Sequence, residues 1–300
     1  MLPSRSRAYA LAFASAIALS SSLPGSATAQ SREITAYVSA LDARGAILDA
    51  LAPADVVVRE DGVAREVLRV TPATDPLQVV LLVDNSAATR DMMADIRRAL
   101  PTFFTALGDS TEVTLVTIAD RPTVAVAATT SRAALQRGVE RLFPQPSAGS
   151  YVMDAIVETS RDLEKRGATR PVIVVVTTDG VEFSNVQADA AIDAMISAGA
   201  ALHVVIVNTS AASAMATDEG RQRAMLYDRG VRATGGQRLD LLTSQSFEKT
   251  LQTLATELTR QFKVVYARPV SLIPPERVTI GAARDAITVR GIRAPLPRTR

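Results

Sequence analysis

The stretch that decides the fold is residues 79–90, VVLLVDNSAATR, in which five apolar residues are followed directly by Asp84, Asn85 and Ser86. The segment Val79–Val83 is apolar at every position, so both faces of the predicted strand must be buried. Such strands are typical of a parallel sheet that is covered by helices on both sides. The polar residues that follow would then lie at the carboxyl edge of the sheet, where open α/β proteins bind their ligands.

The central part of the chain repeats this alternation of apolar strands and amphipathic helices. Further strands are predicted at 113–118, 123–127, 172–176, 202–207 and 239–241, and helices at 92–107, 131–142, 152–163, 186–196, 226–231 and 247–258. Strands that alternate with helices at this spacing indicate an α/β, doubly wound, mostly parallel sheet of Rossmann-like type.

The two ends of the chain have β character instead. Alternating apolar residues run from Glu33 to Val70, with Asp61-Gly62 as a tight turn, and strand-like stretches return at 262–267, 278–280 and 287–289. We therefore predict that the two ends meet in a small β-rich lobe and share one sheet. The predicted organisation is a signal peptide at 1–29, a β-rich segment at 30–74, the α/β domain at 75–262, and a C-terminal β segment and tail at 263–300.

The first residues predict export. Arg5 and Arg7 precede an apolar run at 8–19, and Ala27-Thr28-Ala29 has the small residues of a cleavage site before Gln30. The run is shorter than the roughly 18 to 20 residues that a membrane span needs. We therefore predict cleavage, no stable membrane insertion afterwards, and a periplasmic or extracellular location.

Composition narrows the range of functions. The chain has 33 basic residues, of which two leave with the signal peptide, and 31 acidic residues, so the mature chain is formally neutral and nucleic acid is not an expected partner. It has no Cys and one His, which excludes disulfides, thiolate metal sites and cysteine nucleophiles. His203 lies within an apolar run and is predicted to be a packed, hydrogen-bonded residue rather than a catalytic one. We therefore do not expect an enzyme, and a hydrolase is the least favoured function.

Oxygen-bearing side chains lie where three loops meet the predicted carboxyl edge. Asp84 and Ser86 follow the first apolar strand, Ser150 precedes a helix in Gly149-Ser150, and Asp179 follows the strand at 172–176. Two carboxylates with hydroxyls, and no nitrogen or sulfur ligand, form the kind of donor set that Mg²⁺ prefers. The same side chains could instead cap helices or form turns without any metal.

These residues resemble the metal-ion-dependent adhesion site of von Willebrand factor type A domains. That family has the pattern Asp-x-Ser-x-Ser, then a Thr before a helix, then an Asp after a later strand. Asp84 and Ser86 match, Ser150 stands at the Thr position and Asp179 at the last position. Ala88 stands where the second serine ligand belongs, so the resemblance implies a magnesium site that lacks one hydroxyl.

The resemblance extends over nearly the whole mature chain. Glu60-Asp61-Gly62 is similar to the segment that precedes these domains in exported bacterial proteins, and Tyr266-Ala267-Arg268-Pro269 is similar to their closing strand. It implies a non-enzymatic module that binds another protein at this loop edge, with Mg²⁺ bridging to a carboxylate of the partner. The alternative is a metal-free scaffold for envelope or surface complexes, docking through the β-rich lobe or an exposed strand edge.

Overall fold

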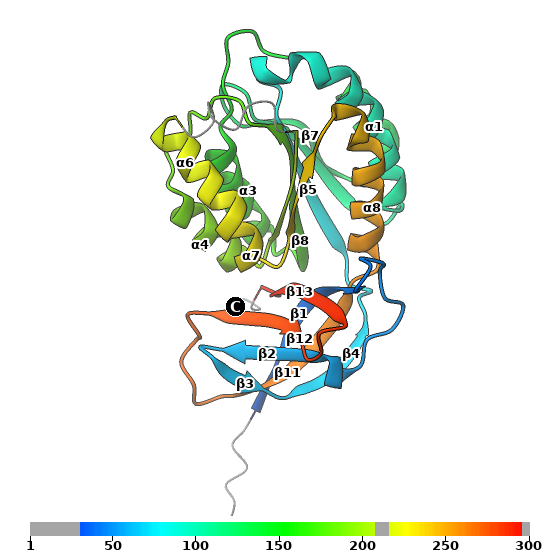
Figure 1. Ribbon diagram of the computed structural model, residues 1–300, viewed down its shortest axis with the longest axis vertical. Helices are drawn as coiled ribbons and strands as arrows, with labels where there is room; N and C mark the ends of the chain where they lie inside the picture. The colour runs from blue at the N-terminus through cyan, green and yellow to red at the C-terminus, as the bar shows by residue number, and fades with distance from the viewer. Residues whose placement is uncertain (1–30, 208–215, 296–300) are drawn as a thin grey trace, which may run out of the picture.

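The structure is a computed structural model that describes residues 31–207 and 216–295. The predicted signal peptide at 1–29 lies outside the described residues. Figure 1 shows two lobes, one with a central sheet between two layers of helices and one made of strands.

The larger lobe is built on one six-stranded sheet. Its strands are β5 (Leu77–Val83), β6 (Glu112–Thr117), β7 (Thr123–Thr129), β8 (Arg170–Thr178), β9 (Ala201–Val207) and β10 (Gln237–Leu241). They lie in the order β10-β9-β8-β5-β6-β7, and every neighbouring pair is parallel except the antiparallel β6 and β7. The predicted doubly wound, mostly parallel sheet is confirmed.

Helices cover both faces of this sheet. They are α1 (Met93–Ala106), α2 (Arg132–Glu140), α3 (Val152–Arg166), α4 (Ala188–Ala198), α6 (Asp218–Met225), α7 (Val231–Ala233) and α8 (Phe247–Thr259). Short helical turns are η1 (Pro53–Asp55), η2 (Ala87–Met92), η3 (Leu226–Gly230) and η4 (Ser244–Ser246). In Figure 1, α1 and α8 lie on one side of the sheet, and α3, α4, α6 and α7 on the other. Within the described ranges, no helix is long and apolar enough to cross a bilayer.

The alternation of strand side chains explains why both faces are covered. Val79 and Leu81 pack into the core under α1 and α8, whereas Val80 and Leu82 pack into the core under α3 and α4. Each fully buried side chain of this size stabilises the fold by roughly 1.5–3 kcal/mol. The apolar segment Val79–Val83 therefore packs against both layers of helices.

One helix begins earlier than the sequence predicted. The helical run that was expected to start at Leu226 begins at Asp218, continues through the π-helical turn η3 and ends at Ala233. Thr217 caps its start, because its hydroxyl accepts a hydrogen bond from the Gly220 amide at 3.1 Å. This earlier start adds the turn that carries Arg223.

The smaller lobe joins the two ends of the chain. Its strands are β1 (Ser31–Asp42), β2 (Val56–Glu60), β3 (Val63–Arg65), β4 (Val67–Pro72), β11 (Phe262–Pro269), β12 (Val278–Ala282) and β13 (Ile287–Arg293). The prediction that the two ends meet and share a sheet is confirmed, but the lobe contains two such shared sheets instead of one. The strands form two sheets, β13-β1-β11-β4 and β12-β2-β3, because both pack their apolar faces onto one common core that contains Ile34, Val58 and Tyr266.

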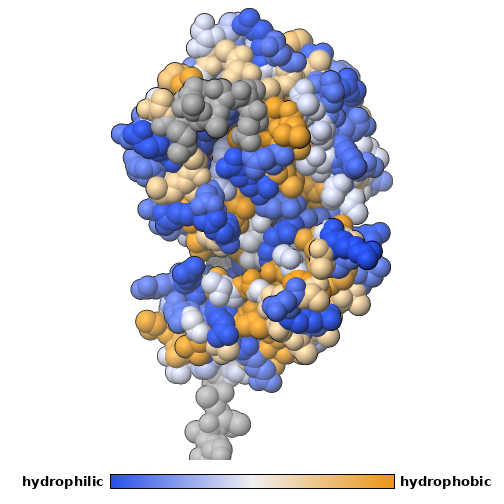
Figure 2. All heavy atoms as spheres, viewed as in Figure 1, coloured by the Kyte–Doolittle hydropathy of each residue, from blue (hydrophilic) through white to orange (hydrophobic). Residues whose placement is uncertain are grey.

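The two lobes touch through β13. Arg290 of β13 forms an ion pair with Glu257 of α8 at 2.6 Å, and Ile292 packs into the core of the larger lobe. The backbones also come close, since a Cβ atom on Gly235 would lie 2.2 Å from the Gly291 carbonyl oxygen. Figure 2 shows apolar and polar residues interspersed over both lobes, with a narrowing between them.

Candidate functional site

Asp84 is buried at the carboxyl end of β5 and is held by two hydrogen bonds. Its Oδ1 accepts from the Ser86 amide at 2.8 Å, and its Oδ2 accepts from the Thr177 hydroxyl at 2.8 Å. The first bond turns the chain sharply after the strand. The second ties the end of β5 to the end of β8.

Asp179 lies beside this turn, at the end of β8. Its Oδ1 accepts a hydrogen bond from the Thr178 hydroxyl at 3.1 Å, and the residue is buried. A Cβ atom on Gly180 would lie 2.6 Å from the Ala88 Cβ and 3.8 Å from the Ser86 hydroxyl. The segment after β8 therefore packs directly on the segment after β5.

Ser150 belongs to the same edge through the loop that follows Asp179. Its amide donates to the Val181 carbonyl at 2.8 Å, and its carbonyl accepts from the Phe183 amide at 2.8 Å. Its hydroxyl lies 3.2 Å from the Val181 carbonyl and 3.1 Å from Glu182 Oε2. The structure thus places all the residues of the predicted site along one carboxyl edge of the sheet.

Two residues of this edge, Glu182 and Ser184, were missed in the sequence. Glu182 Oε1 accepts from the Val152 amide at 3.1 Å, and the Ser184 hydroxyl accepts from the amides of Met153 at 3.0 Å and Asp154 at 3.2 Å. The loop after β8 therefore caps helix α3, whose first amides have no partner within the helix. No local pattern reveals this, because the helix lies about 30 residues earlier in the chain.

Arg223 of α6 brings a positive charge to the edge, and it was also missed. Its Nη1 lies 3.7 Å from Glu182 Oε2 and donates to the Ser150 hydroxyl at 3.5 Å. The Arg223 and Glu182 side chains are 3% and 0% exposed. Burial raises the pKa of Glu182 above its ordinary value, although the hydrogen bonds from Ser184 and the charge of Arg223 act in the opposite direction.

Tyr227, one helical turn after Arg223, is close enough to the charged residues of this edge for them to affect the pKa of its hydroxyl. Burial raises the pKa of its hydroxyl, the charge of Arg223 opposes this shift, and the charges of Glu182 and Asp84 add to it. The end of β5, the loop after β8 and α6 therefore share one buried polar cluster. We call Asp84, Ser86, Ser150, Asp179, Glu182 and Arg223 the polar centre.

The polar centre does not fit Mg²⁺ as it stands. The Ser86 hydroxyl is buried without a partner among the described residues, which would suit an added ligand. Ala88, however, offers a methyl group where a hydroxyl is needed, and the Ser150 hydroxyl is already engaged by Glu182 and Arg223. Mg²⁺ demands nearly ideal octahedral geometry at about 2.0–2.1 Å. Among the residues the structure describes, no three His, Cys, Asp or Glu side chains gather closely enough to hold a metal ion.

Apolar side chains project from the loops around the polar centre. Phe143, Val181 and Phe183 are 61%, 56% and 48% exposed. The Phe183 ring contacts the Tyr151 ring, with centroids 6.1 Å apart and planes tilted by 52°. We call Phe143, Tyr151, Val181 and Phe183 the apolar rim.

Asn85 connects Phe143 to the polar centre. Its Nδ2 donates to the Phe143 carbonyl at 3.2 Å, and its Oδ1 accepts from the Ala119 amide at 3.0 Å. The ring of Phe143 also lies against the guanidinium of Arg97, 5.4 Å from its centroid. The apolar rim is therefore anchored to the ends of both β5 and β6.

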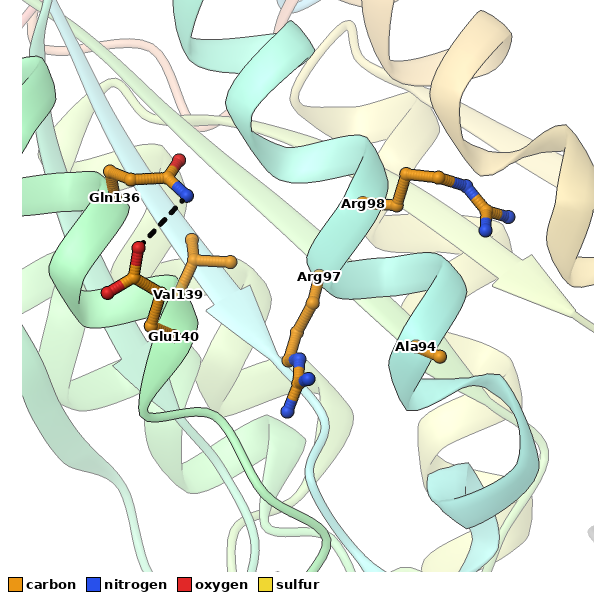
Figure 3. A pocket seen from close by; sticks show the side chains of 6 residues that line it. All are labelled: Ala94, Arg97, Arg98, Gln136, Val139 and Glu140. Atoms are coloured by element: carbon orange, nitrogen blue, oxygen red, sulfur yellow. Dashed lines mark hydrogen bonds between the residues drawn. The ribbon is translucent and has the colours of Figure 1, made fainter.

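A surface hollow of about 330 Å³ lies between α1 and α2, apart from the polar centre (Figure 3). It is lined by Ala94, Arg97, Arg98, Gln136, Val139 and Glu140. Figure 3 shows Arg97 and Arg98 pointing in different directions from α1, and a hydrogen bond of 3.3 Å joins Gln136 to Glu140. No residue of the predicted site lines the hollow, and Arg97 is the residue that links it to Phe143.

His203 is buried in β9, as predicted, but it is not hydrogen-bonded within the described residues. Neither ring nitrogen has a partner there. Burial lowers its pKa to about 4, the charge of Glu257 acts against this shift, and the charge of Arg290 adds to it. His203 is a neutral packing residue on the face of the sheet that α8 covers.

The fold and the polar centre define a class of protein: an α/β domain with polar loops at the carboxyl edge of a mostly parallel sheet, the edge at which open α/β proteins bind ligands. The family model of the von Willebrand factor type A domain matches residues 79–182, which span β5 to the loop after β8. Residues 79–182 are therefore similar to a von Willebrand factor type A domain.

Several solved structures are similar to this chain. A von Willebrand factor type A protein from Catenulispora acidiphila superimposes with a TM-score of 0.51 at 12% identity, over 88% of this chain and 74% of that one. The protein BatB from Bacteroides thetaiotaomicron gives a TM-score of 0.46 at 14% identity, over 61% of this chain and 98% of its own. No curated protein matches the chain by sequence. At 12% identity, the likeness to the Catenulispora acidiphila protein shows the fold alone.

Proposed function

We propose that the chain is an exported protein-interaction module that binds a partner protein through its apolar rim. The observation that carries this proposal is the position of the exposed side chains of Phe143, Val181 and Phe183 around a buried, charged centre. Protein interfaces are typically built in this way, from aromatic anchors beside polar groups that set orientation. Export is proposed from the N-terminal sequence.

Backbone hydrogen bonds hold the loops of the rim in place. The Ala87 amide donates to the Ala148 carbonyl at 3.1 Å, and the Gln145 amide donates to the Asn85 carbonyl at 2.7 Å. Loops that are ordered before binding lose little conformational entropy when a partner docks. The rim is therefore suited to present its aromatic side chains in one fixed arrangement.

The binding free energy would come from burial of the apolar rim. Each aromatic or aliphatic side chain that a partner covers contributes roughly 1.5–3 kcal/mol before the costs of association. The polar centre lies beneath this surface and would set specificity more than affinity. A magnesium bridge to the partner is left out of this proposal, because the donor set does not fit the ion.

An interaction module is better supported than an enzyme. The polar centre holds carboxylates, hydroxyls and a guanidinium, but His203 is buried in the sheet on the face that α8 covers. Because the one histidine lies elsewhere, the polar centre lacks the serine–histidine pair that activates the nucleophile of many hydrolases. We therefore rank a hydrolase last.

The proposal is tested by capturing partners with the purified protein from an envelope extract and from culture medium of the producing cells. Phe183→Ser and Phe143→Ser are expected to lose the captured protein. Ile273→Ser, which changes an exposed residue of the β-rich lobe, is the matched control and is expected to keep it. Capture that persists in both rim variants but is lost in the control would instead favour the scaffold that docks through the β-rich lobe.

A further inference from the structure

We infer that Arg223 supplies, from within the chain, the positive charge that a divalent cation would supply at this edge, so that partner binding needs no metal. This inference rests on the proposed function, since it concerns the same edge. Its structural basis is the contact of the guanidinium with two groups of the polar centre. Nη1 lies 3.5 Å from the Ser150 hydroxyl and 3.7 Å from Glu182 Oε2.

The position of Arg223 is set by the fold. Thr217 caps the start of α6, and Gln222 Oε1 accepts a hydrogen bond from the Ala188 amide at the start of α4, at 3.0 Å. Tyr227, on the same side of the helix one turn later, is buried. Because Gln222 and Tyr227 are both held in place, Arg223 between them is directed into the polar centre.

The charges of the centre explain why a cation is needed there. Asp84, Asp179 and Glu182 are all buried within one short stretch of the edge. Buried carboxylates are costly unless a positive charge or hydrogen bonds compensate them. Arg223 Nη1 lies 3.7 Å from Glu182 Oε2, and its positive charge is permanent because a guanidinium keeps its proton at any working pH.

The substitution at position 88 is consistent with this internal cation. Ala88 is exposed, so the site has room for a hydroxyl there, yet the chain has none. Ser150, at the position of another expected ligand, already accepts a hydrogen bond from Arg223. One expected ligand is absent and another is already hydrogen-bonded to Arg223, and both features weaken the capacity of the site to hold a metal.

The test is to create a metal site by replacing both Ala88 and Arg223. The full chain and its variants are titrated with MnCl₂ and MgCl₂, with heat of binding and melting temperature as readouts. The wild type and Ala88→Ser are expected to show no binding. Ala88→Ser combined with Arg223→Met is expected to bind Mn²⁺ and to gain about 4 °C or more in melting temperature at saturation.

Two controls show that the effect belongs to this arginine. Ala88→Ser with Arg223→Lys keeps the positive charge and is expected to show no metal binding. Ala88→Ser with Arg268→Met removes another buried arginine, which pairs with Glu60 in the β-rich lobe at 3.2 Å. This variant is also expected to show no metal binding. A gain in the Arg268 variant would show a general effect of destabilisation and would overturn the inference.

The inference is overturned if the wild type binds either ion at one site, or if the folded double variant gains no response. If the Arg223→Met variants fail to fold, the inference is tested instead by partner capture with the wild-type protein in the presence of EDTA. Undiminished capture supports the inference, and capture that requires Mg²⁺ contradicts it while leaving the proposed function intact. Conversely, if Phe143→Ser and Phe183→Ser capture the partner as well as the wild type does, the proposed function is refuted, whereas the result of the metal titration still holds.

Discussion

The hydroxyl of Ser184, in the loop after β8, accepts a hydrogen bond from the Met153 amide of α3 at 3.0 Å. Because that amide has no partner within its own helix, Ser184→Ala is expected to lower the free energy of unfolding by about 1 kcal/mol. Urea unfolding followed by circular dichroism measures this loss. Ser271→Ala, at an exposed position, is the control and should stay within about 0.5 kcal/mol of wild type; equal losses would contradict the capping role.

Asn85 holds two strands and one loop of the rim together. Asn85→Ala leaves the buried amide of Ala119 without its acceptor and releases the Phe143 carbonyl, so a loss of about 1–3 kcal/mol is expected. Hydrogen exchange should also become faster at residues 143–149. Asn185→Ala removes an exposed side chain in a nearby loop, and it should change neither measurement.

The strand β13 contains a glycine where no side chain fits. A Cβ atom on Gly291 would lie 2.1 Å from the Tyr37 carbonyl oxygen, so Gly291→Ala is expected to cost about 3 kcal/mol or more and to lower the melting temperature. Gly281→Ala in the neighbouring β12 is the matched control, because nothing lies within 4 Å of its Cβ position. Similar melting temperatures for both variants would contradict the close packing of β13 on β1.

His203 makes stability depend on pH. Its pKa is lowered to about 4 in the folded chain, chiefly by burial, so between about pH 6.5 and 4 the unfolded chain binds more protons than the folded one. Stability therefore falls as the pH is lowered through this window, by about 2 kcal/mol between pH 7 and 5 for this group alone.

The variant His203→Leu isolates this contribution. It keeps an apolar packing residue and removes the proton-binding group, so its loss of stability from pH 7 to 5 should be smaller than that of the wild type by about 2 kcal/mol. Chemical unfolding at both pH values gives the four free energies that are needed. Parallel profiles for the two proteins would show that His203 does not titrate in this range.

Much of the fold can be predicted from the hydrophobic periodicity of the sequence. Val79–Val83 predicts a strand covered on both faces, and the structure confirms it as β5. The turn at Asp61-Gly62 was also predictable, and both residues have positive φ, 49° and 83°. The start of α6 at Asp218 was missed because few of its residues are apolar, and its end is buried only through tertiary packing.

The sequence by itself determined that Asp84, Ser86 and Asp179 would lie at one edge, because polar residues that follow buried parallel strands share the carboxyl side of a sheet. Ser150, which precedes a helix, was assigned to the same edge. Only the tertiary structure decided which charges meet there. Glu182 and Arg223 belong to a loop and a helix whose contact depends on how α6 packs on the sheet. Hydrophobic periodicity is a local property of the chain, whereas an ion pair between distant segments exists only once those segments have packed.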